Sequence, residues 1–189
     1  MKKVLFLLAL SIITFSCTPS WTAEEKNIIN SELRVYKTSS PSDSAVLRAQ
    51  CIDIPERQLK KAEYELLIKK MLKTVQDPVN NGVGIAAPQI GINRNLVLVQ
   101  RFDKEGEPFE AYPNLRVIHF SDSLQTGPEG CLSIDNAYGN VTRAASIQVS
   151  YFDSALDKTV EENISGFTAV IFQHEADHLN GILFTDYLK

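Results

Sequence analysis

The sequence lacks a surplus of positive charge, because 19 lysines and arginines stand against 23 aspartates and glutamates and leave a formal net charge of −4. Binding to the phosphate backbone of nucleic acids therefore has no electrostatic basis, and we expect no nucleic-acid partner. No repeat with a period of about 20 to 50 residues is present, which excludes a solenoid or propeller. The chain has 189 residues, 44% hydrophobic and 22% charged, which is typical of one globular domain.

Cysteine is also scarce, and the three cysteines are Cys17, Cys51 and Cys131. An odd number argues against a disulfide framework, even in an exported protein. We interpret Cys51 as a small buried hydrophobic side chain. Cys17 and Cys131 lie in segments whose patterns suggest other roles.

The first residues resemble an export signal. Two lysines precede an apolar run over residues 4–13, which is too short to span a bilayer. Ser16 stands directly before Cys17, as a small residue does in bacterial lipoprotein signals. Residues 1–16 are therefore predicted to be a lipoprotein-type signal peptide, with Thr14 standing where that pattern usually has leucine. A plain signal peptide and an uncleaved anchor are the alternatives.

This signal predicts that Cys17 is lipidated and that a lipid anchor holds the exported protein at a membrane. If the segment is not used, we expect a cytoplasmic protein. The polar residues 17–33 are predicted to be a tether, which leaves residues 34–189 as the folded domain.

The remaining pattern predicts an α+β fold in which a mostly antiparallel sheet packs around a C-terminal helix, with another helix near the N-terminus. The glycine-rich stretch 126–140 is expected to be a loop, and Ser165 and Asn180-Gly181 to bound the last helix. The helices are expected over residues 56–75 and 166–179, and the strands over 95–100, 115–120, 146–152 and 158–164.

The last of these helices carries the residues most typical of a metal site. His174 and His178 are four residues apart, so both rings project from one helical face, and Glu175 can reach a water bound between them. Two core histidines satisfied by hydrogen bonds are the alternative interpretation. A catalytic metal needs a third protein ligand and one open position.

The third ligand is expected upstream of this helix. One metalloprotease class has a further histidine six residues after the second one, but that position here is Phe184. Asp186 is too close to His178 in sequence to be the third ligand. His119 lies in a strand pattern and is interpreted as a solvated or edge histidine, so Cys131, in the glycine-rich stretch, is the better candidate.

Three segments, in this order along the chain, resemble the signature motifs of peptide deformylases: residues 82–89 (GVGIAAPQ), 129–133 (EGCLS) and 174–178 (HEADH). The resemblance extends over about residues 34–189. It implies a divalent metal, with Fe²⁺ expected first and Zn²⁺ or another divalent ion as alternatives. The implied ligands are Cys131, His174 and His178.

The resemblance also implies the reaction, which is removal of the formyl group from the N-terminal formyl-methionine of peptides or nascent chains, with release of formate. Glu175 is implied as the proton carrier, and the Gln89 amide and the Leu132 backbone N–H as stabilisers of the developing oxyanion. The implied substrate contacts are the backbone of Val83 and Gly84 and a side-chain pocket formed by Phe167, Val170 and Ile171.

Two other functions remain as alternatives: a membrane-anchored binding protein of the same fold without turnover, and a metallopeptidase that cuts internal amide bonds. The upstream cysteine disfavours the metallopeptidase. Asp135-Asn136 replaces the Pro-Gly that commonly follows the second motif, and Tyr112 stands where asparagine is common. Asn136 tolerates a left-handed backbone better than most residues, so the turn can be kept.

Overall fold

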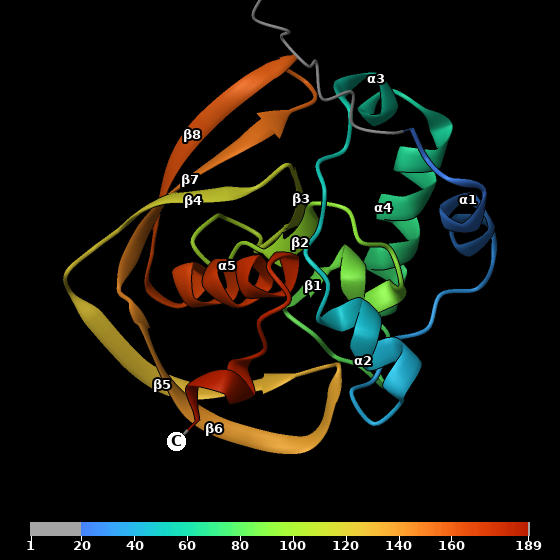
Figure 1. Cartoon of the computed structure of the whole chain (residues 1–189). Coiled ribbons are helices and arrows are strands. Elements are labelled where there is room, and N and C mark those ends of the chain that lie inside the picture. Colours follow the sequence, from blue (N-terminus) through green and yellow to red (C-terminus); the bar gives the residue numbers. More distant parts are fainter. Residues whose placement is uncertain (1–19, 189) are drawn as a thin grey trace, which may run out of the picture.

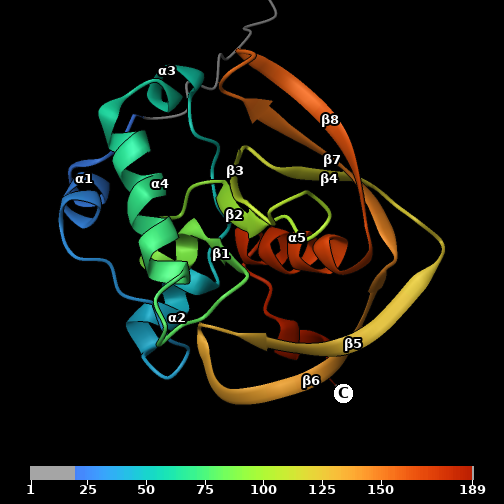
Figure 2. The same ribbon diagram turned by 180° about the vertical axis from the view of Figure 1, so that it is seen from behind.

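The computed structural model describes residues 20–188, and Figures 1 and 2 show it from opposite sides. The strands form three antiparallel sheets, ordered β1-β2-β3, β4-β7-β8 and β5-β6. The helices are α1 (Ala23–Asn30), α2 (Pro41–Leu47), α3 (Glu56–Leu59), α4 (Ala62–Val75) and α5 (Gly166–Leu179), with 3-10 turns η1 (Ala87–Ile90) and η2 (Phe184–Tyr187). The strands are β1 (Gly84–Ala86), β2 (Leu96–Gln100), β3 (Phe109–Pro113), β4 (Arg116–Phe120), β5 (Leu124–Cys131), β6 (Ile134–Ala144), β7 (Ser146–Asp153) and β8 (Lys158–Ser165).

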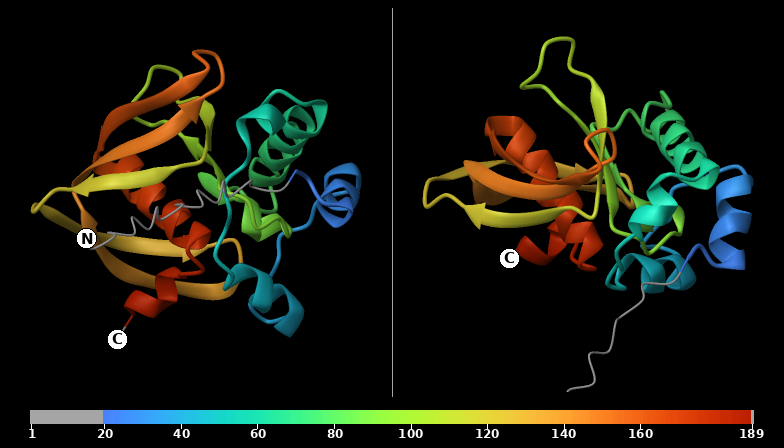
Figure 3. Two further views of the ribbon diagram at one scale, coloured as in Figure 1. Left: turned by 45° about the horizontal axis from the view of Figure 1, so that its top comes forward. Right: turned by 90° about the horizontal axis from the view of Figure 1, so that it is seen from above.

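The sheet β1-β2-β3 is buried on both faces. Leu96 and Leu98 point into a core shared with α1 and α4, whereas Val97 and Val99 point into a second core shared with α5. Successive side chains of a strand project to opposite faces, so an uninterrupted apolar run is needed to fill both cores. Figure 3 (right) shows this sheet between α4 on one side and α5 on the other.

Helix α5 occupies the centre of the remaining structure, where it packs against β1, β2 and elements of the other two sheets. Its bounds, Gly166–Leu179, agree with the predicted helix, and Gly181 follows it with a left-handed φ of 71°. The predicted α+β class, with antiparallel sheets around a C-terminal helix, is confirmed. Among residues 20–188, no helix has both the length and the apolar character required to cross a membrane.

The prediction of a tether over residues 17–33 is wrong for residues 20–33. Thr22 caps α1, and Ile29 is fully buried against the α4 core. Trp21 is only 5% exposed, and Glu25 forms an ion pair with the buried Arg94. Residues 20–33 look polar in sequence because most side chains of α1 face solvent and Ile29 is its buried residue. Cys17 and residues 1–16 lie outside the described residues.

The stretch 126–140 is not a loop but most of the hairpin β5–β6, whose partners run from Leu124↔Ala144 to Cys131↔Ile134. Its glycines, proline and asparagines have low strand propensity, so the local sequence indicates a loop where the structure has paired strands. Gly130 pairs with Tyr138 although Cys131 already pairs with Ile134, so residues 135–137 form a bulge. Asn136 sits there with φ 56°, which confirms the left-handed turn.

Other elements also differ from the sequence prediction. The helix expected over residues 56–75 is interrupted between α3 and α4, where Lys60 and Lys61 lie outside both. Helix α2 (PSDSAVL) and strand β1 (GIA) are too short to show a clear periodic pattern, and strand β3 (FEAYP) lacks the valine- and isoleucine-rich character by which strands are predicted. His119 is exposed on β4, as expected.

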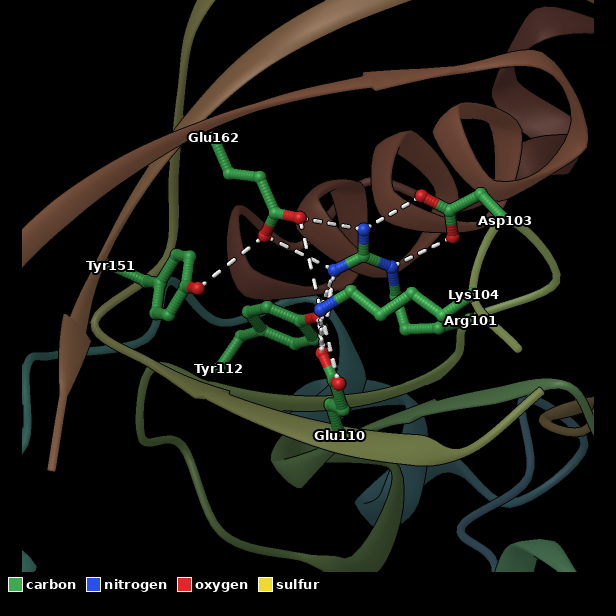
Figure 4. A network of polar contacts seen from close by, with 7 residues as sticks. All are labelled: Arg101, Asp103, Lys104, Glu110, Tyr112, Tyr151 and Glu162. Atoms are coloured by element: carbon green, nitrogen blue, oxygen red, sulfur yellow. Dashed lines mark hydrogen bonds and ion pairs between the residues drawn. The ribbon is translucent and has the colours of Figure 1, made fainter. Parts of the chain in front are cut away.

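A buried arginine joins the strands around the start of α5. Arg101 is 2% exposed and forms ion pairs with Asp103, Glu110 and Glu162, and it donates a hydrogen bond of 2.6 Å to the Tyr112 hydroxyl. Figure 4 shows this group, in which each carboxylate comes from a different element or loop. The network therefore ties β3 and β8 to the end of β2.

Candidate metal centre

The structure brings Cys131, His174 and His178 together. The Cys131 Sγ lies 3.2 Å from Nε2 of His178, and the ligand atoms of all three residues lie within 4.8 Å of one another. The two histidines are one turn apart on α5, with ring centroids 5.2 Å apart. Cys131 ends β5, so the hairpin carries the sulfur to the helix. His119, the other candidate, lies outside this group.

A buried carboxylate orients the first histidine. Nδ1 of His174 donates a hydrogen bond of 2.8 Å to Glu129, which leaves Nε2 as the ligand atom. Glu129 is itself held by Arg143, which also binds Asp177. Burial alone would raise the pKa of Glu129, but the hydrogen bonds from His174 and Arg143 outweigh it and lower that pKa to about 2. The carboxylate is therefore ionised in the folded protein at neutral pH.

The two histidines differ in their affinity for a proton. Burial lowers the pKa of both rings, but at His174 the hydrogen bonds with Cys131 and Glu129 reverse this effect and raise the pKa to about 10. At His178 burial prevails, with help from the neighbouring His174, and the pKa is well below its usual value. A metal is bound by neutral imidazole, so metal and proton compete at His174.

Glu175 lies beside this group and is 4% exposed. Burial raises the pKa of its carboxyl group to about 7, and the nearby carboxylates of Glu129 and Asp177 add to that effect. A Cβ atom added to Gly84 would lie 2.5 Å from Oε1 of Glu175. Only glycine at this position lets strand β1 approach the carboxylate so closely.

The Gln89 side chain, on the 3-10 turn η1, also reaches the group of ligand atoms. Its Oε1 accepts a hydrogen bond from the Ala86 backbone N–H at 2.8 Å, which fixes the amide. Its Nε2 then points to the hairpin turn, 3.6 Å from Cys131 Sγ and 3.2 Å from the Ser133 hydroxyl. The amide N–H groups are therefore aimed at the group of ligand atoms.

A cavity of about 300 Å³ opens onto these residues. It is lined by all the site residues predicted from the sequence except the buried His178, and Cys17, which is outside the described residues: Val83, Gly84, Gln89, Cys131, Leu132, Phe167, Val170, Ile171, His174 and Glu175. Phe167 is 54% exposed at the mouth and packs against Phe102. Val170 is partly buried and Ile171 is buried.

The residues present fit a divalent metal. One thiolate and two imidazoles supply three ligands of the type found in mononuclear hydrolytic sites and leave a fourth position for water. Oε2 of Glu175 is buried and has no hydrogen-bond partner among residues 20–188. A water in the fourth position would satisfy that oxygen.

Cys51 is not one of the clustered ligand residues. It is partly buried, and burial raises the pKa of its thiol to about 12, so it remains a neutral thiol. Glu129 is the residue whose contact with His174 was not predicted. Because residues 126–140 are expected to be a loop, no strand alternation could indicate the position of Glu129 relative to Cys131.

A Cys/His/His group beside a buried carboxylate at the bottom of a cavity defines a class, the metal-dependent hydrolases with a single ion. A family model described as Polypeptide deformylase matches residues 33–189. The peptide deformylase of Prochlorococcus marinus is 34% identical over 171 residues, which are 89% of this chain and 79% of that protein. The chain therefore belongs to the peptide deformylase family.

Solved structures agree with this assignment. The Met-Ala-Ser-bound class I type b peptide deformylase from Acinetobacter baumannii is 32% identical, with a TM-score of 0.73 over 84% of this chain and 99% of that one. The actinonin-bound form of that enzyme gives a TM-score of 0.72 at 32% identity, over 83% of this chain and 98% of that one. The family implies a divalent metal, and the Cys/His/His group is where this chain can hold it.

Proposed function

We propose that this chain hydrolyses the formyl group from the N-terminal formyl-methionine of peptides, with Cys131, His174 and His178 as the metal ligands. The observation that carries the proposal is the buried Glu175 carboxylate, which lines the same cavity as Cys131 and His174 and whose Oε2 has no hydrogen-bond partner among residues 20–188. Family membership and the Met-Ala-Ser peptide bound by the Acinetobacter relative support the same substrate class.

When bound, the metal supplies a water of lowered pKa and polarises the formyl carbonyl. Glu175 takes the proton of the attacking water and later returns it to the departing amine. The Gln89 amide and the Leu132 backbone N–H donate to the oxygen that becomes negative. Formate and a free amino terminus are the products.

The substrate is proposed to bind along strand β1. This strand lies at the edge of its sheet, with β2 as its neighbour, so the other side can pair with an extended peptide. Val83 and Gly84 are the proposed backbone partners. Phe167, Val170 and Ile171, which line the cavity, are proposed to receive the methionine side chain.

We propose Fe²⁺ as the physiological ion, as the resemblance to the family implies. Zn²⁺ is the alternative, because thiolate and imidazole ligands accept both ions. Metal analysis of protein purified without oxygen from unsupplemented cells tests this choice. About one iron per chain is the expected result, and zinc alone would contradict the proposal.

The substrate class is tested by comparing formyl-Met-Ala-Ser with acetyl-Met-Ala-Ser. The expected result is formate release from the first peptide and no acetate release from the second. The chain would be the binding protein considered above if metal were bound and neither peptide reacted. Cleavage between methionine and alanine would instead support the metallopeptidase alternative.

We also propose that the exported protein is anchored by lipid at Cys17, on the sequence pattern described above. Cys17→Ala is expected to abolish labelling by radioactive palmitate, whereas the control Cys51→Ala retains it. Equal labelling of the Cys17 variant, or none in the wild type, would contradict lipidation. Formylated peptides outside the cytoplasm are then the proposed substrates, and a cytoplasmic fraction that contained all of the protein would contradict this location.

A further inference from the structure

A lysine from the segment before α2 reaches the hairpin turn that carries Cys131. The Nζ of Lys37 donates one hydrogen bond of 2.8 Å to the Leu132 carbonyl oxygen and another of 2.7 Å to Asp135 Oδ1. Asp135 belongs to the bulge of the hairpin, where the sequence departs from the common Pro-Gly. The bulge therefore supplies a carboxylate that holds the ammonium group on the Leu132 carbonyl.

The chain around Lys37 is itself fixed. Its backbone N–H donates to Asp43 at 3.1 Å, and Arg34 binds both oxygens of that carboxylate. The next backbone N–H, of Thr38, donates to the Ser133 carbonyl oxygen at 2.9 Å. Two successive residues of this segment thus bind the two carbonyl groups of the hairpin turn.

The Leu132–Ser133 peptide group connects Lys37 to Cys131, the candidate metal ligand. The Leu132 carbonyl and the Ser133 N–H belong to the same peptide group, and this N–H lies 3.4 Å from Cys131 Sγ. A cation on the oxygen of a peptide group polarises it and makes its N–H a stronger donor. Hydrogen bonds to a ligand sulfur reduce the electron density that the sulfur gives to a metal.

We propose that Lys37 is a positioning residue of the metal centre, which acts through the Leu132–Ser133 peptide group and is held in place by Asp135. The inference rests on the proposed metal ligation by Cys131. The Lys37 and Asp135 side chains are 37% and 55% exposed, and such ion pairs contribute about 0–1 kcal/mol to the free energy of unfolding. Lys37 is therefore expected to affect the metal centre rather than the stability of the fold.

Cobalt(II) is the probe, since a cysteine thiolate bound to it gives a charge-transfer absorption band. The full chain is loaded with Co²⁺, and the band is recorded without substrate. In Lys37→Met we expect the band to move to longer wavelength, because the sulfur then donates more charge. Lys37→Arg, which keeps a cationic donor, and Lys158→Met, an exposed lysine on β8, are expected to keep the wild-type band.

Turnover adds a second readout. We expect kcat/KM for formyl-Met-Ala-Ser to fall about tenfold in Lys37→Met, with recovery in Lys37→Arg. An unshifted band in Lys37→Met, or an equal shift in Lys37→Arg, would overturn the proposal. Absence of the band in the wild type would overturn ligation by Cys131 and this inference together. A shifted band with no turnover in the wild type would reject the proposed reaction and keep the role of Lys37.

Discussion

Glu129 connects the candidate ligand His174 to the rest of the protein, since it accepts from that ring and from Arg143. Glu129→Gln keeps the shape but removes the charge that favours the Nδ1–H form of the ring. We expect metal affinity to fall about 10- to 100-fold, as for other partners of ligating histidines. Competition with a chelator measures this. Glu161→Gln, an exposed change on β8, is the control, and equal affinities of the two variants would contradict the role of Glu129.

Gly84 tests how closely β1 must approach Glu175. A Cβ atom at this position would lie 2.5 Å from Glu175 Oε1 and 2.8 Å from Ile171 Cγ2, so Gly84→Ala must displace the carboxylate or the strand. We expect formate release to fall at least about tenfold, because such displacements at a reacting centre are costly. Gly127→Ala on β5, where a Cβ meets nothing within 4 Å, should be neutral. Similar rates for both variants would show that the approach at Gly84 is not needed.

Individual residues of the site could be predicted to different degrees. His174, Glu175 and His178 were recognisable because one helical turn fixes their spacing. Cys131 was identified only by exclusion and resemblance, since its approach to the helix depends on a hairpin 43 residues before His174 in sequence. Lys37 and Asp135 are 98 residues apart, and nothing local in either segment indicates the contact.

At the scale of elements, α1 is the clearest departure from the sequence prediction. It contributes the fully buried Ile29 to the core with α4. Ile29→Ala is expected to lower the free energy of unfolding by about 3 kcal/mol, the cost of lost burial plus a cavity. Urea denaturation measures the change, with the exposed Glu24→Ala as control. A loss below about 0.5 kcal/mol would mean that α1 does not pack on the domain in solution.

The hairpin β5–β6, which carries Cys131, is predicted from its sequence to be a loop. Its sequence has low strand propensity because it contains several glycines, asparagines and a proline, of which Asn136 lies in the bulge near Cys131. The strands are recognisable only from their pairing with each other. By contrast, β2 (LVLVQ) is a continuous apolar run and β7 (SIQVSYFD) largely alternates polar and apolar residues, so local pattern and final structure agree.

At the scale of the molecule, the Arg101 network joins parts of the chain that are distant in sequence. The hydrogen bond with Arg101 lowers the pKa of Asp103 to about 2. A depressed carboxyl pKa stabilises the fold above the unfolded value of about 3.8, and this contribution is lost as the pH falls toward 2. The network therefore contributes to stability at neutral pH and weakens in acid.

Asp103→Asn is expected to lower the free energy of unfolding by about 1 kcal/mol at pH 6. The difference from the wild type should shrink at pH 3, because the wild-type carboxyl group then begins to take up a proton. Urea midpoints at the two pH values test this. A difference that is constant or larger at pH 3 would contradict the assigned role of Asp103.

The overall class followed from the sequence because helices and strands separate clearly along the chain, whereas the two-core arrangement did not. Both cores depend on β2, whose uninterrupted apolar run fits a strand covered on both faces as well as a buried helix segment. Only the packing of α4 and α5 on opposite sides resolves the choice.

The central claim is that one metal ion, held by Cys131, His174 and His178 beside Glu175, is the hydrolytic centre. The most direct test is formate release per bound metal ion in Fe²⁺-loaded protein. The wild type should turn over, Glu175→Gln should keep about one ion per chain and lose at least about a thousandfold in rate, and His178→Ala should bind no ion tightly. Wild-type turnover per ion in Glu175→Gln, or a full complement of ion in His178→Ala, would contradict the account.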